Sequence, residues 1–163
     1  MLAPSESLSI IGVGFGVESN CRGRVLVLID AKRELVLYLR LSQAFKERRQ
    51  MQERDKALVI GGACASMMQM PAIEKFCRSV ILQRNRGHML KRWESFTEAL
   101  EDEDFHLLLR QIRKKIPEER ALELLEDFQY HCPVKKSDHK SNESFAAAVL
   151  GIELDWLREN FGD

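Results

Sequence analysis

The sequence predicts an α+β fold in which a small N-terminal antiparallel meander of three strands is followed by a layer of about five amphipathic helices. Before residue 42, apolar residues recur at a period of two, which is typical of strands. After residue 70 they recur at spacings of three and four, which is typical of helices. We therefore expect a single domain over residues 1–163, with a β-rich part at 1–42 and a helical part at 43–163.

Three segments are expected as strands. Ser9 to Ser19 alternates apolar residues with glycines, Arg24 to Asp30 is a short apolar run, and Glu34 to Ser42 has leucine at alternate positions. Their short connections favour an antiparallel meander, because a parallel return requires a crossover of about a dozen residues or more. One alternative stays open. Leucine, arginine and glutamate favour helices, so Glu34 to Lys56 could also form one long helix.

The next two segments are less regular. Gln43 to Lys56 is polar on almost all sides, and we expect a solvated helix or a connector. Ala57 to Met70 is apolar and rich in small residues, and Gly61-Gly62 divides it. We interpret its first residues as a buried strand.

Five apolar stripes at helical spacing follow. The expected helices begin at Pro71, near Met89, near Phe105, at Pro117 and at about Glu143, and the last continues to about Asn160. Val134 to Asn142 is the one clear loop in this part. Because each stripe must be buried against another element, we expect the helices to form one layer on the sheet.

Composition excludes several classes of protein. With 45% hydrophobic residues and only 9 Gly and 4 Pro, the chain is neither disordered nor collagen-like. Its apolar runs are far shorter than the ~20 residues that a membrane span requires. The four cysteines lack CxxC spacing, which favours reduced thiols. We expect a soluble cytoplasmic protein.

No cofactor is expected. Gly12-Val13-Gly14-Phe15-Gly16 resembles the start of a dinucleotide-binding loop, but Val17 does not fit the spacing of that motif. Eight residues separate Gly16 from Val25, too few to include the helix that would hold the pyrophosphate.

Cys64 is a weak candidate for a catalytic nucleophile. It follows a predicted buried strand and several small residues, as a nucleophile does on a sharp strand-to-helix turn. The motif is loose, because Ser66 stands where glycine is expected, and no histidine is identified as the base. A free cysteine is more commonly a small buried apolar residue.

Two clusters could hold a metal. His131, Cys132 and His139 lie beside or within the predicted loop, although structural zinc sites normally show paired ligands on each arm. Glu101 to Asp104 is an acidic run without the spacing of a calcium loop. It begins a helix that ends in three basic residues, so it is explained by compensation of the helix dipole.

A local excess of basic residues is the strongest functional feature. The whole chain has zero net charge, but residues 1–100 carry +6 and residues 101–163 carry −6. The basic corner has six candidate binding residues: Arg78, Arg84, Arg86, His88, Lys91 and Arg92. Such side chains could contact phosphates, although a sequence pI of 6.9 is low for a nucleic-acid-binding domain.

The leading functional hypothesis is a small, non-catalytic intracellular binding or regulatory protein with a protein partner. The basic corner would be the first contact and Glu98 to Asp104 the second. Nucleic-acid binding through the same corner is the first alternative, and a thiol enzyme that uses Cys64 is the second. The sequence leaves the oligomeric state open.

Overall fold

The computed structural model describes residues 30–162, and its regular elements there are all helical. The first of them occupies residues 30–47 and is called the 30–47 helix here. It runs beside α2 (Met51–Met67), which also packs against α3 (Pro71–Arg84). The remaining elements are η1 (Met89–Arg92), α4 (Phe96–Ala99), α5 (Glu103–Lys115), α6 (Glu118–Asp127), η2 (Lys136–Asp138), α7 (Asn142–Val149) and α8 (Leu154–Phe161).

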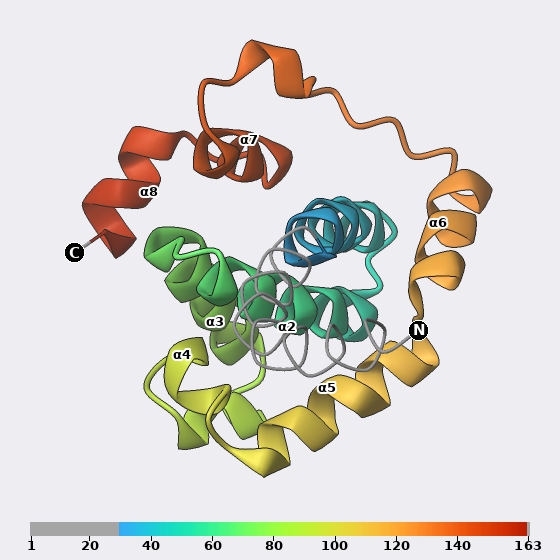
Figure 1. Cartoon of the computed structure of the whole chain (residues 1–163). Coiled ribbons are helices and arrows are strands. Elements are labelled where there is room, and N and C mark those ends of the chain that lie inside the picture. The colour runs from blue at the N-terminus through green and yellow to red at the C-terminus, as the bar shows by residue number, and fades with distance from the viewer. Residues whose placement is uncertain (1–29, 163) are drawn as a thin grey trace, which may run out of the picture. The chain divides into compact units, whose positions relative to one another are not determined.

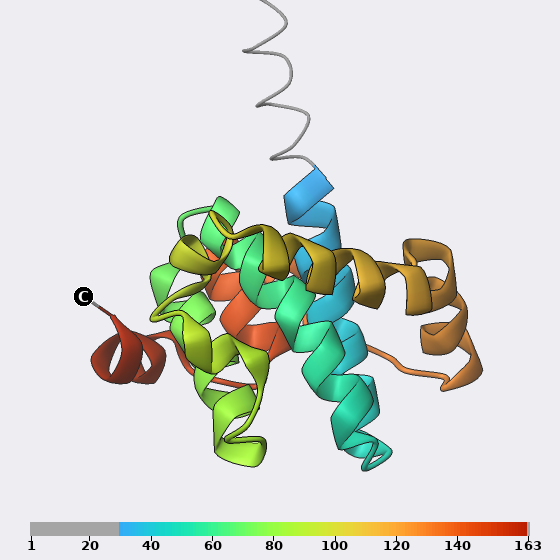
Figure 2. The same ribbon diagram turned by 90° about the horizontal axis from the view of Figure 1, so that it is seen from below.

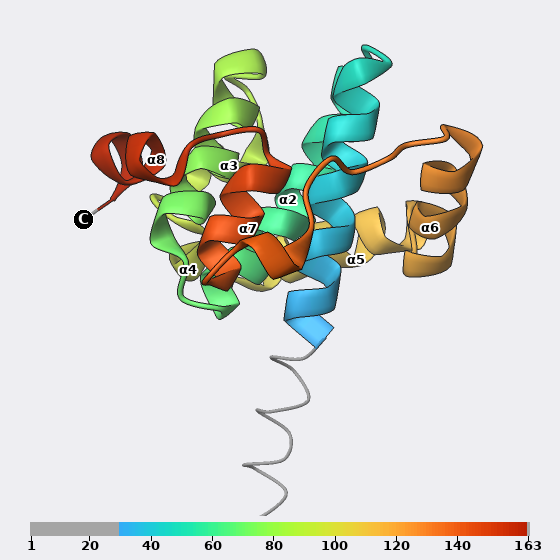
Figure 3. The ribbon, with the colours of Figure 1, turned by 90° about the horizontal axis from the view of Figure 1, so that it is seen from above.

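The helices of residues 31–162 form three layers. The 30–47 helix, α2 and α3 make the middle layer, between α7 and α5 (Figure 1). From below, α5 crosses in front of the middle layer (Figure 2), whereas from above it is α7 that crosses in front (Figure 3). The two helices α6 and α8 lie at opposite ends of this arrangement.

The α+β prediction is wrong for the described part of the chain, because residues 30–162 contain no strand. Glu34 to Ser42, the third predicted strand, lies entirely within the 30–47 helix, which also crosses the predicted boundary between a β-rich and a helical part at residue 42. The segment from Ser9 to Ser19 lies outside the described residues, as does all of Arg24 to Asp30 except Asp30 itself.

Burial explains the error at Glu34 to Ser42. A half-buried strand would hide the leucines and expose the residues between them, yet Tyr38 is 1% exposed and Ser42 is 0% exposed. Less buried positions recur instead at spacings of three and four residues along one side of a helix. Arg33, Val36, Arg40, Gln43 and Glu47 follow this spacing, and Lys32, Glu34 and Lys46 are also less buried.

The central element is α2, which is buried on every side from Ala57 to Ala65. A helix with apolar residues all round is expected to be buried in this way. Its two glycines allow close approach on different sides. A Cβ atom at Gly61 would lie 2.9 Å from Leu39 Cδ2, and a Cβ atom at Gly62 would overlap the ring of Phe96.

Two predictions for the middle of the chain are therefore corrected. Ala57 to Met70 does not begin with a strand, and Gly61-Gly62 does not divide it, because both glycines lie inside α2. Gln43 to Lys56 is not one solvated helix or connector. Its first residues end the 30–47 helix, and those from Met51 begin α2.

Most of the later helices match the apolar stripes. Pro71 occupies the first position of α3, and α5 and α6 span the predicted segments. The helix expected near Met89 is instead divided into η1 and α4, since the Ser95 side chain caps a new start by accepting from the Glu98 N–H. The last helix is also divided, at Gly151, whose φ of 73° ends α7.

Three other helix ends use a residue other than glycine in the left-handed conformation. Arg49, Gln69 and Gln129 have φ values of 59°, 56° and 51°. After α2, the Met70 N–H donates to the Ala65 carbonyl and the Gln69 N–H donates to the Ser66 carbonyl. These two hydrogen bonds satisfy two carbonyls at the end of α2. They require Gln69 to adopt the left-handed conformation, in which glycine is preferred because it has no Cβ atom.

None of the helices in the described residues is both long and apolar enough to cross a membrane.

The substitution Gly62→Ala tests the close approach of Phe96 to α2. Replacing a helical glycine by alanine normally stabilises a helix by about 1 kcal/mol. Here we expect the reverse, a loss of about 1–3 kcal/mol, because the new methyl group displaces a packed ring. Denaturant unfolding measures the change. Gly87→Ala is the control, since its Cβ atom would meet nothing closer than 3.6 Å. Equal stability of the two variants would contradict the account.

The substitution Gln69→Gly tests the left-handed turn after α2. Removing the side chain relieves the conformational cost of a positive φ, so we expect a gain of about 1 kcal/mol. The control is Gln69→Ala, which keeps a Cβ atom and should leave thermal stability unchanged. A gain for alanine equal to that for glycine would show that the backbone conformation is not the cause.

Candidate functional site

The basic corner lies on α3, η1 and the turn between them. The structure brings its six predicted binding residues into one region, but they have different environments. Several of the six side chains form hydrogen bonds or ion pairs within the protein and therefore stabilise the fold. The others have no such partner, and their charge faces solvent.

Arg84 holds a buried carboxylate. Asp55, near the start of α2, has a side chain that is only 4% exposed. The Arg84 Nε atom donates to Asp55 Oδ2 at 2.5 Å, and Arg54 forms an ion pair with Oδ1 at 3.1 Å. A buried carboxylate requires such partners, because its charge is costly to remove from water. Arg84 therefore fastens the end of α3 to the start of α2.

Arg78 and Arg92 also have internal partners. The Arg78 guanidinium donates two hydrogen bonds to the Trp93 carbonyl, at 2.7 and 3.1 Å. Arg92 lies over the Trp93 ring at 5.0 Å and pairs with Asp104 at 2.9 Å. Both side chains stabilise the segment that joins α3 to α5.

His88 caps η1, since its Nδ1 atom accepts a hydrogen bond from the Leu90 N–H. Burial lowers the pKa of His88 from its usual value. The Asp55 carboxylate opposes this shift and Arg84 adds to it. His88 is thus a neutral acceptor at neutral pH and adds no charge to the corner.

Four members of the predicted set are exposed: Arg84, Arg86, Lys91 and Arg92. Of these, Arg86 and Lys91 form no side-chain hydrogen bond or ion pair with any other residue that the structure describes. Arg86 lies at the edge of a groove of about 540 Å³ between α3 and the end of α8. We call this hollow the basic groove. Its lining residues are Lys75, Arg78, Ser79, Leu82, Gln83, Arg86, Glu94 and Phe161.

Aromatic rings support one side of the basic groove. Phe161 of α8 packs edge-on against Phe76 of α3, with ring centroids 5.8 Å apart, and Trp156 lies 6.0 Å from Phe161. Trp156 is 46% exposed, which is high for so large an apolar side chain. The groove therefore has cationic side chains and the ring of Phe161 in its lining, and the exposed Trp156 lies next to Phe161. Such surfaces are typical of protein contacts, where tryptophan and arginine are enriched.

Cys64 does not lie on a strand-to-helix turn. It is fully buried inside α2, where its Sγ atom is 3.5 Å from Glu34 Oε2. Burial is the main cause that raises the pKa of the Cys64 thiol, and the Glu34 carboxylate adds to it. Arg113, which pairs with Glu34 at 2.8 Å, opposes the shift. This environment keeps the thiol protonated, whereas a nucleophile requires the thiolate.

The predicted metal ligands are not brought together. Within residues 30–162, no group of three or more His, Cys, Asp or Glu side chains is arranged to hold a metal ion. His131 is exposed, Cys132 is partly buried, and His139 lies against Ser144 with Nδ1 3.0 Å from Oγ.

Within the acidic segment from Glu98 to Asp104, the Asp102 carboxylate forms hydrogen bonds that stabilise the local structure. One Asp102 oxygen accepts from the Asp104 N–H and caps α5, and the other accepts from Trp93 Nε1. These two hydrogen bonds lower the pKa of Asp102. The pairing of Asp104 with Arg92 further joins this segment to the basic corner. As the sequence predicts, α5 has acids in its first turn and three basic residues in its last turn, which compensates the helix dipole.

Comparison with protein-family models, with curated proteins and with solved structures finds no match to this chain. The candidate site therefore depends on its geometry alone.

Sequence reasoning missed the contribution of α8 to the basic groove. Phe161 and Trp156 belong to a helix more than 60 residues after Arg86 in the sequence, and no local spacing relates them. One signal in the sequence was Gly151, which interrupts the last predicted helix. The helix ends there, so Trp156 belongs to α8 and does not continue the apolar stripe of α7.

Two neighbouring arginines test the assignment of structural and solvent-facing charges. We expect Arg84→Ala to reduce the free energy of unfolding by about 2 kcal/mol, because Asp55 stays buried with one partner fewer. Arg86→Ala should change it by less than about 0.5 kcal/mol, as is usual for exposed positions. Urea unfolding at neutral pH measures both. A similar loss for the two variants would refute the assignment.

Proposed function

We propose that this chain is a non-catalytic protein-binding domain whose basic groove holds an acidic, partly apolar segment of a partner protein. The observation that carries the proposal is the lining of that groove. Three cationic side chains, Lys75, Arg78 and Arg86, surround apolar surface from Leu82 and Phe161. Glu94 is the one acid among the lining residues.

The chemistry of this lining favours a peptide over a nucleic acid. Nucleic-acid binding requires many phosphate contacts from unengaged cations. Arg78, Arg84 and Arg92 already bind acceptors of this protein, which leaves Arg86 and Lys91 as the cations of the predicted set without such partners. Of these two, only Arg86 is among the residues that line the groove, together with Leu82 and Phe161. A charged side chain beside apolar surface suits a segment that alternates acidic and apolar side chains.

A cytoplasmic location accords with this proposal. Cys64, Cys77 and Cys132 are free thiols, and the first two are buried. Burial raises the pKa of Cys77 to about 12, so both buried thiols are protonated and unreactive. The fold has no need of an oxidising compartment to hold these described cysteines together.

The binding test uses a synthetic peptide of alternating glutamate and leucine. Its addition should move Trp156 emission to shorter wavelengths, because Trp156 packs beside Phe161, which lines the groove. Trp93 is only 5% exposed and should contribute little to the change. We expect Arg86→Ala to weaken binding about threefold to tenfold by loss of a charged contact. The matched control is Arg110→Ala, an exposed arginine on α5.

Two results would contradict the proposal. One is peptide binding that Arg86→Ala and Arg110→Ala weaken equally, which would indicate attraction to the whole surface. The other is preferential binding of a generic DNA duplex, with an affinity that falls steeply with salt and depends on Arg86, which would favour the nucleic-acid alternative.

A further inference from the structure

The position of α6 leaves one of its faces without a partner. Its inner face is held by the 30–47 helix, where Phe128 packs edge-on against Phe45 at 5.7 Å and lies under Arg48 at 4.1 Å. Ala121 is fully buried on the same side. Glu118 pairs with Arg33 at 2.9 Å and fixes the start of the helix. The helix is thus anchored, and its outer face is a defined surface.

That outer face is apolar at its centre. Leu122 is 51% exposed, the largest exposed fraction among the large apolar residues of the described chain, and Leu125 lies one turn further along. Together with Glu126, Gln129, Tyr130 and His131 they line a hollow of about 760 Å³, which we call the α6 groove. Two leucines and a tyrosine are among its lining residues, so it offers contacts to apolar side chains of a partner.

The segment that forms the α6 groove is itself acidic, although Arg33 pairs with Glu118 at its start and Arg48 lies over Phe128 at its end. Residues 118–131 carry five acids and one base, Arg120, a net charge of −4 with His131 neutral. Arg120 is paired with Glu123 at 3.1 Å. The side chains of Glu119 and Glu126 form no hydrogen bond or ion pair with other residues in the described range. Both lie one turn from Leu122, on either side of it.

The last turn of α6 departs from the usual distribution of charge in a helix. Glu126 and Asp127 occupy the end where the helix dipole is negative, and no basic residue lies there. By contrast, α5 begins with Glu103 and Asp104 and ends with three basic residues. Positions where a local rule is broken are often kept for function. Cations supplied by a bound partner would offset both the carboxylates and the dipole.

We propose that the α6 groove binds a basic amphipathic helix of a second protein. Its apolar residues, spaced three and four apart, would cover Leu122 and Leu125, and its lysine or arginine side chains would pair with Glu119 and Glu126. This site is independent of the basic groove. The two surfaces lie at opposite ends of the molecule, near α6 and α8 (Figure 1, Figure 3), so occupation of one leaves the other open.

The test uses a synthetic amphipathic helix built from leucine and lysine, titrated into the full chain and followed by calorimetry. We expect Leu122→Ala to weaken binding about tenfold, because most of an exposed leucine becomes buried in the complex. Glu126→Gln should weaken it about threefold and reduce the dependence of affinity on salt. Alanine and glutamine both favour helices, so neither change unfolds α6.

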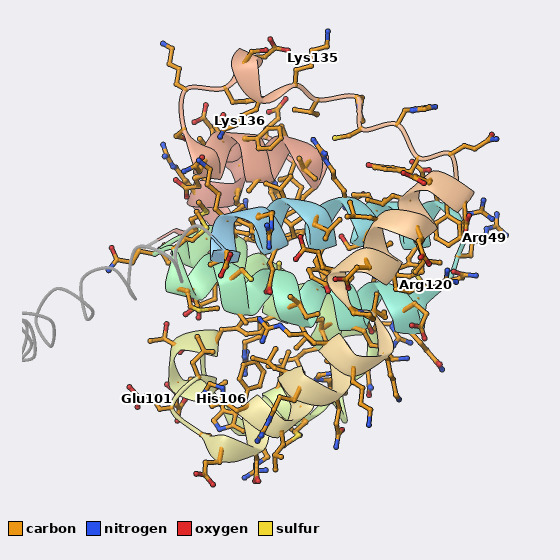
Figure 4. The ribbon with its side chains drawn as sticks, turned by 45° about the vertical axis from the view of Figure 1, so that its right-hand side comes forward. Arg49, Glu101, His106, Arg120, Lys135 and Lys136 are labelled. Atoms are coloured by element: carbon orange, nitrogen blue, oxygen red, sulfur yellow. The ribbon has the colours of Figure 1, made fainter. Side chains whose placement is uncertain are left out.

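Two control variants match these changes elsewhere. Leu107 on α5 is 48% exposed, so Leu107→Ala removes a leucine of similar exposure. Glu101→Gln removes an exposed acid from the α4–α5 corner, which lies well away from Arg120 of α6 (Figure 4). Neither should change the affinity. Loss of affinity in the control variants equal to that in Leu122→Ala and Glu126→Gln would overturn the proposal.

Two further outcomes separate the possible occupants. Absence of binding to the leucine-lysine helix overturns the proposal. So does self-association of the full chain that Leu122→Ala abolishes in sedimentation, because the occupant would then be a second copy. Arg86→Ala should leave binding of the basic helix unchanged. Failure at the α6 groove is therefore distinguishable from failure of the proposed function at the basic groove.

Discussion

The structure depends on a helix with two adjacent glycines at its centre. In α2, Gly61 and Gly62 leave bare backbone on adjacent sides, and the small residues Ala63, Cys64 and Ala65 follow them. Leu39 of the 30–47 helix occupies one bare side and Phe96 of α4 occupies another. Because neighbours can approach this part of α2 from every side, the domain buries the helix from Ala57 to Ala65 and arranges the other helices around it.

Charged side chains near α2 differ from those at the ends of the domain in whether they have a partner within the protein. At the start of α2, the buried carboxylate of Asp55 is paired with both Arg54 and Arg84. Unpaired charge is found further out, at Arg86 beside α8 and at Glu126 on α6. A rigid centre with two differently charged ends is a suitable scaffold for binding, because the surfaces are fixed before a partner arrives.

The sequence predicts the amphipathic helices well and the buried ones badly. Patterns of burial are informative only where one side faces solvent, as in α5 and α6. In residues 34–42 the positions between the leucines include the buried Tyr38 and Ser42, and the leucines recur at a period of two that mimics a strand. In α2 the two glycines mimic a turn. Similarly, the sequence identifies the basic corner but not the pairing of Arg84 with Asp55, which depends on contacts between distant segments.

Native-state hydrogen exchange tests the central role of α2 most directly. The account predicts that the amides of Ala57 to Ala65 exchange only through global unfolding, with the highest protection in the chain, since they are enclosed on all sides. Amides of α6 and α8, with one face in solvent, should exchange through smaller openings. Protection in α2 no higher than in those peripheral helices would contradict the account.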